Sequence, residues 1–172
     1  MQVTGLPPLL IAPTPSLTNP MSSHQIAVEV DYHQFYLWDP TIPAEAPEDY
    51  TDEDVRRMVK VADHVVVVQP VRNGTVPVGL TLFPADPGFP IEEFDHVVEC
   101  SLDLPGGQLQ VHECMGGAVL DLEVQAGTYR VRVLFHSLAT LDEDHLDGKD
   151  SYTVQLWPGE QRGLTVVKQW AD

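Results

Sequence analysis

A chain of 172 residues with 43% hydrophobic content is long enough to form one globular domain around a substantial core. It carries 26 aspartates and glutamates against 9 lysines and arginines, a formal net charge of -17. A surface with this charge repels nucleic acid and anionic membranes, so we expect neither as a partner, and it attracts basic proteins and cations. The apolar stretches are also too short for a membrane-spanning helix.

The first 24 residues differ in composition from the rest of the chain. Prolines stand there among threonines and serines without a periodic pattern, so residues 1–24 are expected to form a flexible tail. The short apolar stretch at 9–12 follows no basic segment, and Pro7 and Pro8 interrupt it, which argues against a secretory signal. Met1 and Met21 are both candidate start residues. Residues 25–172 are predicted to form a single domain in the cytoplasm.

The first predicted strand begins near Gln25, where apolar residues at 26, 28 and 30 alternate with polar or small ones. An aromatic run follows with Tyr32, Phe35, Tyr36 and Trp38, and its apolar positions change parity, which indicates a bulge or bend. Alternating strand faces would bury some of these rings and expose others as an interaction patch. Residues 39–49 then form a Pro-rich acidic loop.

Residues 51–54 have the composition of a helix start. Thr51 is suited to cap the helix, and Asp54 stands where a capping box has Glu or Gln. Asp52 and Glu53 add negative charge at the positive end of the helix dipole. Apolar residues then recur at helical spacing, so the one substantial helix is predicted over residues 52–62.

The rest of the chain has the period-2 pattern of strands. The apolar run 64–69 predicts a central strand, Asn73-Gly74 a two-residue hairpin turn, and Pro77 an edge position for the next strand. Further strands are expected at 97–104, 108–114, 120–124, 129–135, 152–156 and 164–170. About eight or nine short strands predict a mainly β fold, an antiparallel β-sandwich with one short helix.

The two cysteines are predicted to be unpaired. Strands 97–104 and 108–114 flank a turn, and pairing of Leu104 with Leu109 places the thiols of Cys100 and Cys114 on opposite faces. A disulfide would require a register shift or a bulge, and Gly116-Gly117 leaves that alternative open. Unpaired thiols fit a reducing compartment.

Residues 142–150 form an acidic loop with five carboxylates, Asp142, Glu143, Asp144, Asp147 and Asp150. The four aspartates are also candidate ligands for calcium, which takes about six to eight oxygens. The loop departs from the EF-hand pattern, because its glycine stands one position late and a threonine replaces the final glutamate. Three interpretations stay open: a solvated loop, a calcium site, and a contact surface for a basic protein.

No motif indicates catalysis or a cofactor. The seven histidines lack metal-protease spacing, and His112 and Cys114 would need a third ligand such as His136 to hold zinc. No serine stands in a nucleophile elbow, and the Gly-Gly pairs lie at turns rather than in phosphate-binding loops. We therefore predict neither a cofactor nor enzymatic activity.

Several short motifs resemble, in the same order, those of the competence protein J family, which are bacterial inhibitors of the DNA-entry nuclease. They are Asp31-Tyr32-His33-Gln34-Phe35, Tyr50-Thr51-Asp52-Glu53, Ala62-Asp63, Gln69-Pro70-Val71-Arg72-Asn73, Ala126-Gly127-Thr128-Tyr129-Arg130-Val131 and Asp150-Ser151-Tyr152-Thr153-Val154. The resemblance covers most of residues 27–156. The loops at 39–49 and 142–149 are longer than in the family, and the tail has no counterpart.

This resemblance implies an acidic protein that binds and blocks a bacterial nuclease. The charge fits independently, because nucleases that attract DNA have basic clefts, which an acidic protein can occupy. The expected contact residues are Asp52, Glu53, Asp54, Asp142, Glu143, Asp144, Asp147 and Asp150. The alternative is a β-sandwich that binds a ligand or carbohydrate without catalysis, with Trp38, Trp157 or Trp170 as a stacking platform.

Overall fold

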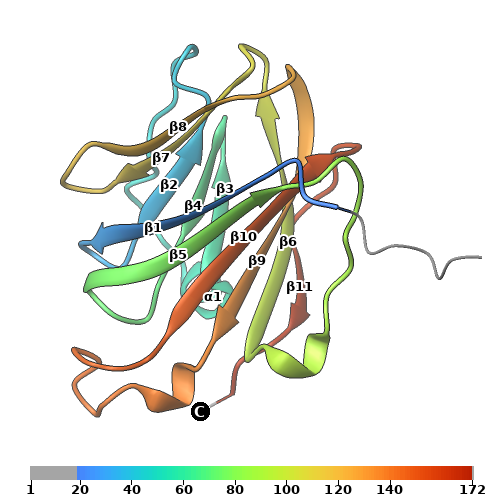
Figure 1. Cartoon of the computed structure of the whole chain (residues 1–172). Coiled ribbons are helices and arrows are strands. Elements are labelled where there is room, and N and C mark those ends of the chain that lie inside the picture. Colours follow the sequence, from blue (N-terminus) through green and yellow to red (C-terminus); the bar gives the residue numbers. More distant parts are fainter. Residues whose placement is uncertain (1–18, 172) are drawn as a thin grey trace, which may run out of the picture.

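The computed structural model describes residues 19–171 and contains two β-sheets around one hydrophobic core (Figure 1). The six-stranded sheet has the order β1 (Ser22–Val30), β5 (Gly74–Leu82), β10 (Ser151–Pro158), β9 (Gly127–His136), β6 (His96–Leu104) and β11 (Thr165–Lys168). The five-stranded sheet has the order β3 (Val59–Ala62), β4 (Val65–Val68), β2 (Phe35–Trp38), β7 (Gln108–Glu113) and β8 (Ala118–Glu123). Neighbouring strands are antiparallel except β5 and β10, which run parallel.

The mainly β sandwich predicted from alternating apolar residues is confirmed. In β6, Val98, Cys100, Leu102 and Leu104 all point into the core, as their shared face predicts. Phe35 from the opposite sheet lies in the same buried cluster. The period-2 pattern therefore identified the inner faces of the strands correctly.

Two short glycine-containing connections join strands of different sheets rather than hairpin partners. Asn73-Gly74 leads from β4 into β5, and Gly106-Gly107 leads from β6 into β7. The predicted Asn73-Gly74 hairpin and the predicted pairing of Leu104 with Leu109 are therefore wrong. At the second corner Gly107 has a φ of 68° and donates its N–H to the Leu104 carbonyl. Both leucines stay buried, because a corner between two sheets turns each apolar face toward the same core.

Pro77 lies in an interior strand, so its predicted edge position is wrong. β5 stands between β1 and β10, and its pairing with β10 begins at Val78. The proline has no N–H to donate, and it precedes that paired stretch. The apolar run before it forms β4, whose four valines are buried between β3 and β2, as the prediction of a central strand requires.

The helix is shorter than predicted. α1 spans Asp52–Arg57, and 3-10 turns lie at Ile91–Glu93 and Leu138–Thr140. Met58 takes a left-handed conformation with a φ of 59°, which ends the helix, and Val59–Ala62 form β3 beside β4. Strand pairing thus overrides the helical spacing of the apolar residues. No helix within residues 19–171 is long and apolar enough to cross a membrane.

β1 begins earlier than the sequence predicts. Ser22 already pairs with Leu82 of β5, and the N–H of Met21 donates to the Leu82 carbonyl. Residues 22–24 therefore belong to the sheet rather than to the tail. The expectation of a flexible tail over residues 1–18 lies outside the described residues.

Both cysteines are unpaired, as predicted, although different sheets separate them rather than the two faces of one hairpin. Cys100 is fully buried in β6. Cys114 follows β7 and is half-buried in a separate cluster with Tyr36.

We expect alkylation of the folded protein to modify Cys114, and Cys100 only after unfolding. Burial shields the Cys100 thiol and raises its pKa to about 12, so its reactive thiolate is scarce at neutral pH. Intact-mass measurements after alkylation without reductant should show one adduct in native buffer and two in denaturant. Equal labelling of both thiols in native buffer would contradict the burial of Cys100.

Candidate functional site

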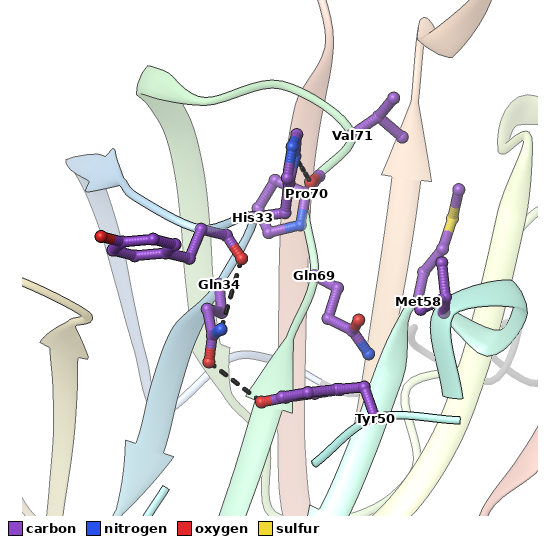
Figure 2. Close-up of a pocket in the computed structure, with 9 residues that line it drawn as sticks. His33, Gln34, Tyr50, Met58, Gln69, Pro70 and Val71 are labelled. Carbon is purple, nitrogen blue, oxygen red and sulfur yellow. Dashed lines mark hydrogen bonds between the residues drawn. The ribbon is translucent and has the colours of Figure 1, made fainter. Parts of the chain in front are cut away.

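A cavity of about 420 Å³ opens where β1 ends and β2 begins (Figure 2). Three segments of the chain line it. Residues 32–34 form the first, Tyr50, Val55 and Met58 belong to the second, and residues 69–71 form the third. We call it the Tyr50 pocket. The sequence did not predict this pocket, but the three segments carry three of the motifs that resemble the competence protein J family. The presence of these motifs in three separate segments is the signal in the sequence that could have indicated it.

The first wall of the pocket is the tight turn between β1 and β2. Asp31 and Gln34 pair across it, and Tyr32 and His33 both have positive φ, at 53° and 55°. Positive φ is costly for residues with side chains and persists only where neighbouring groups impose it. The bend predicted from the parity change is therefore a left-handed turn that the surrounding structure holds in place.

The 69–73 segment supplies the groups that hold this turn. The N–H of His33 donates to the side-chain oxygen of Asn73 at 2.8 Å. The His33 ring contacts the Pro70 carbonyl through Nδ1 at 3.2 Å and the Asn73 amide nitrogen through Nε2 at 3.3 Å. Both ring nitrogens of His33 are therefore engaged by the 69–73 segment, which fixes the orientation of the ring.

Gln34 connects the turn to the aromatic side of the pocket. Its side-chain oxygen accepts hydrogen bonds from the hydroxyls of Tyr36 and Tyr50, each at 2.9 Å, and its amide donates to the Tyr32 carbonyl. Burial, and then the nearby Cys114 and acidic residues, raise the pKa of Tyr50, so its hydroxyl stays protonated and can donate. Figure 2 shows Tyr50 closing the pocket on the side opposite His33 and Pro70.

Helix α1 forms the remaining wall. The predicted capping box is present, because Thr51 Oγ1 accepts from the Asp54 N–H at 3.1 Å and Asp54 Oδ2 accepts from the Thr51 N–H at 2.9 Å. The Thr51 N–H bond is the main cause that lowers the pKa of Asp54. Gln69 donates through its backbone to the Met58 carbonyl at 2.8 Å and through its side chain to the Asp54 carbonyl at 3.1 Å. The helix is thereby fastened to the 69–73 segment.

Two apolar side chains on the pocket are exposed to solvent. Tyr32 is 71% exposed and Val55 is 59% exposed, so neither contributes to the core. Exposed apolar groups beside a preformed cavity are typical of an interaction site.

The first predicted acidic contact segment borders this pocket at the start of α1. Glu53 forms ion pairs with Arg56 and Arg57 on the helix surface, and Asp54 pairs with Lys60 at 3.0 Å. Asp52 is exposed, and no ion pair of the described residues includes it. Asp52 is thus the carboxylate of this segment that is free to meet a partner.

The second predicted segment, the acidic loop, is divided between surface and interior. Asp142, Glu143, Asp144 and Asp147 are exposed, and hydrogen bonds from the backbone of Leu146 and Asp147 lower the pKa of Asp142. These four residues keep their place as contact candidates.

Asp150 is buried and must be removed from the predicted contact surface. Its carboxylate accepts from Arg72 Nε at 2.8 Å and from the Tyr152 hydroxyl at 2.6 Å, and its side chain has no exposed area. Asp150 stands directly before β10, where the chain enters the sandwich. A calcium site at Asp142, Asp144, Asp147 and Asp150 has no support, since no three metal-ligating side chains converge anywhere in residues 19–171.

The 69–73 segment connects both acidic segments. Gln69 binds the Asp54 carbonyl of α1, and Arg72 binds Asp150 at the end of the acidic loop. Segments 52–54 and 142–150, which are far apart in the sequence, therefore meet the same short piece of chain beside the Tyr50 pocket.

The residues considered for zinc binding and for stacking on a ligand do not lie close together. His112 and Cys114 lie with the five-stranded sheet, and His136 ends β9 of the other sheet. No group of three His, Cys, Asp or Glu side chains within residues 19–171 could hold a metal ion. The tryptophans form no common platform. Trp157 is buried beneath the guanidinium of Arg132, and Trp170 packs against the core.

Trp38 lies apart from the other two tryptophans, on the outer side of β2. It stacks on Tyr36 with 5.3 Å between ring centroids and donates its indole N–H to Gln110. The aromatic run is therefore divided, with Phe35 in the core and Tyr36 and Trp38 in the outer cluster.

Several basic side chains are withdrawn from the surface together with the carboxylates that pair with them, Asp54, Glu99 and Asp150, so the surface keeps the acidic excess of the composition. Arg130 and Arg132 are buried against Glu99 in the six-stranded sheet, and Lys60 and Arg72 are mostly covered. Four of the nine basic side chains are thus largely withdrawn from solvent. A partner meets chiefly carboxylates.

Comparison with solved structures identifies the same kind of two-sheet sandwich in other proteins. The structure is similar to that of ComJ from Bacillus subtilis, described as an inhibitor of the DNA degrading activity of NucA, with a TM-score of 0.64 and 15% identity. The match covers 84% of this chain and 100% of ComJ. The fold that the family resemblance implied is confirmed, and the chain has a ComJ-like fold.

A second solved structure, the product of crocagin biosynthetic gene J, is similar with a TM-score of 0.52 and 20% identity over 80% of this chain and 96% of that chain. No family model and no curated protein matches the sequence. At these identities the likeness defines the fold, and function must be argued from the site.

Proposed function

We propose that this protein is a non-catalytic inhibitor that binds a DNA-degrading nuclease and blocks its access to DNA. The observation that carries the proposal is the fold, which matches the nuclease inhibitor ComJ over that protein's whole length.

The charge supports the same partner class. A nuclease must attract the phosphate backbone of DNA, and a protein with a net charge of -17 competes for the same basic surface. Asp52, Asp142, Glu143, Asp144 and Asp147 are exposed and carry charge toward a partner. Charge complementarity of this kind accelerates association and selects basic partners.

The geometry of the pocket favours binding over catalysis. His33 is its only histidine, and both of its ring nitrogens already have hydrogen-bond partners. The nearby Asp54 carboxylate serves as a helix cap and pairs with Lys60. The two unpaired cysteines agree with a proposed location in the cytoplasm.

The test is an inhibition assay with the full chain and a nuclease from its own cell. A basic nuclease that is encoded beside the gene, or recovered with the protein from native cells, is purified and supplied with DNA. We expect added protein to stop DNA degradation at a near-equimolar ratio and to degrade nothing by itself. Unchanged degradation at micromolar inhibitor would overturn the proposal and favour the ligand-binding alternative.

A further inference from the structure

We propose that the Tyr50 pocket is the anchor point of the nuclease interface and that it receives one arginine side chain of the nuclease. This inference rests on the proposed function and adds to it the place and the chemistry of the central contact. Three properties of the pocket support it: its preformed shape, its apolar lining, and its acidic surroundings.

The pocket is preformed at some conformational cost. Tyr32, His33 and Met58 all have positive φ, and all three line it. The His33 N–H donates to Asn73 and the Gln69 N–H donates to the Met58 carbonyl, and these hydrogen bonds hold the turn and the helix end in these conformations. Strained backbone clustered at one cavity is a feature of binding sites, because a rigid site loses less entropy when its partner enters.

The surroundings of the pocket favour a cation. Six carboxylates and no lysine or arginine lie between residues 45 and 55. The protein's own Lys60 places its ammonium 5.0 Å from the centre of the Tyr50 ring, and that ammonium donates to the Asp49 carbonyl and to Asp54. The Tyr50 ring, the Asp49 carbonyl and the Asp54 carboxylate therefore already stabilise the positive charge of Lys60.

The neighbouring basic residues neutralise only part of this negative charge, and Lys60 already pairs with Asp54. Arg56 and Arg57 pair with Glu53, and Arg72 pairs with Asp150. Asp49 and Asp52 are exposed, and no ion pair of the described residues includes either of them. A cation from outside would therefore find unpaired carboxylates on the residue before Tyr50 and on the first residue of α1.

Arginine combines the two properties that the pocket requires. Its aliphatic stem can lie against Val55, Met58 and Tyr50, which line the pocket. Its guanidinium can then interact with the exposed carboxylates of Asp49 and Asp52 in the adjoining segment. Arginine is also enriched among the residues that dominate binding energy at protein interfaces, and it stacks readily on tyrosine rings. A purely apolar side chain would fill the pocket but would make no favourable electrostatic interaction with Asp49 and Asp52.

A pair of opposite charges at Val55 tests this inference. Val55 is exposed on α1, so V55R and V55D should both fold, which melting temperatures can verify. We expect V55R to weaken binding of the purified nuclease by about tenfold or more, mainly through faster dissociation. We expect V55D to bind as tightly as the unmodified protein or a few-fold more tightly.

Met21 supplies the matched control. It is 70% exposed and precedes β1, whereas the pocket follows β1, so about 30 Å of strand separates the two sites. M21R and M21D make the same changes in net charge, and each should alter the dissociation constant by less than about threefold at fixed ionic strength. The difference between the Val55 pair and the Met21 pair isolates the effect of the pocket.

The outcomes separate this inference from the proposed function. If both Val55 variants weaken binding equally, the occupant is apolar and the arginine is wrong. If neither variant changes binding, the pocket lies outside the interface, although the protein remains an inhibitor. If the unmodified protein neither binds nor inhibits the nuclease, the proposed function itself fails.

Discussion

Asp150→Asn should lower the free energy of unfolding by about 2–3 kcal/mol, because it removes the charge that compensates a mostly buried arginine. Arg72 has 13% of its side chain exposed and donates to Asp150, which is itself fully buried. Asparagine can still accept from the Tyr152 hydroxyl, so the loss is chiefly that of the ion pair. For a protein of this size the melting temperature should fall by about 4–10 °C.

Asp144→Asn is the matched control for Asp150→Asn. It makes the same chemical change at an exposed position of the same loop, and it should alter stability by less than about 0.5 kcal/mol. A double variant, Arg72→Met with Asp150→Leu, should recover part of the loss, because no unpaired charge then remains inside. Equal melting of the two single variants would show that the buried pair contributes no stability.

The inner faces of the strands could be predicted because burial in a strand follows a local rule. Side chains alternate between the two faces, so Val98, Cys100, Leu102 and Leu104 were recognised as core residues without knowledge of their partners. The same holds for the start of α1, whose capping box depends on residues three positions apart. Local patterns of this kind need no tertiary information.

The connections between strands could not be predicted in the same way. A Gly-containing dipeptide such as Asn73-Gly74 indicates a connection between strands, but it does not say which sheet the next strand joins. Likewise Met58 is not a glycine, so nothing in the sequence marks the left-handed residue that ends α1. That conformation depends on Gln69, which binds the Met58 carbonyl from eleven residues away.

The candidate site was only partly predictable for a related reason. Asp150 was grouped with its acidic neighbours, whereas its burial depends on Arg72, a residue 78 positions earlier. The Tyr50 pocket brings three separate segments together, and no single segment has a binding motif. The short motifs shared with a known family lie in all three segments, but they indicated a family and not a pocket.

Replacing Asp142, Asp144 and Asp147 together by asparagine should slow association with the nuclease by about three- to tenfold at low salt. The three carboxylates are exposed, and the chain beside them meets the 69–73 segment, which also lines the Tyr50 pocket. They therefore act on an approaching basic surface through solvent rather than through a buried contact. Stability should change little, since asparagine keeps the side-chain oxygen through which Asp142 binds the backbone of Leu146.

The dependence on salt distinguishes steering from direct contact in this triple variant. Ions screen exposed charges over about 8 Å at physiological ionic strength, so the association rates of the variant and the unmodified protein should converge as salt rises. Dissociation should stay within about twofold, because charges at the rim of an interface act mainly on the encounter. Stopped-flow measurements between low and high salt give both rates.

Glu92, Glu123 and Glu160 are also exposed, and their joint replacement by glutamine removes the same charge elsewhere. If this control slows association as much as the loop variant does, only the net charge matters. If the loop variant keeps both the association rate and the salt dependence of the unmodified protein, the acidic loop plays no part in binding.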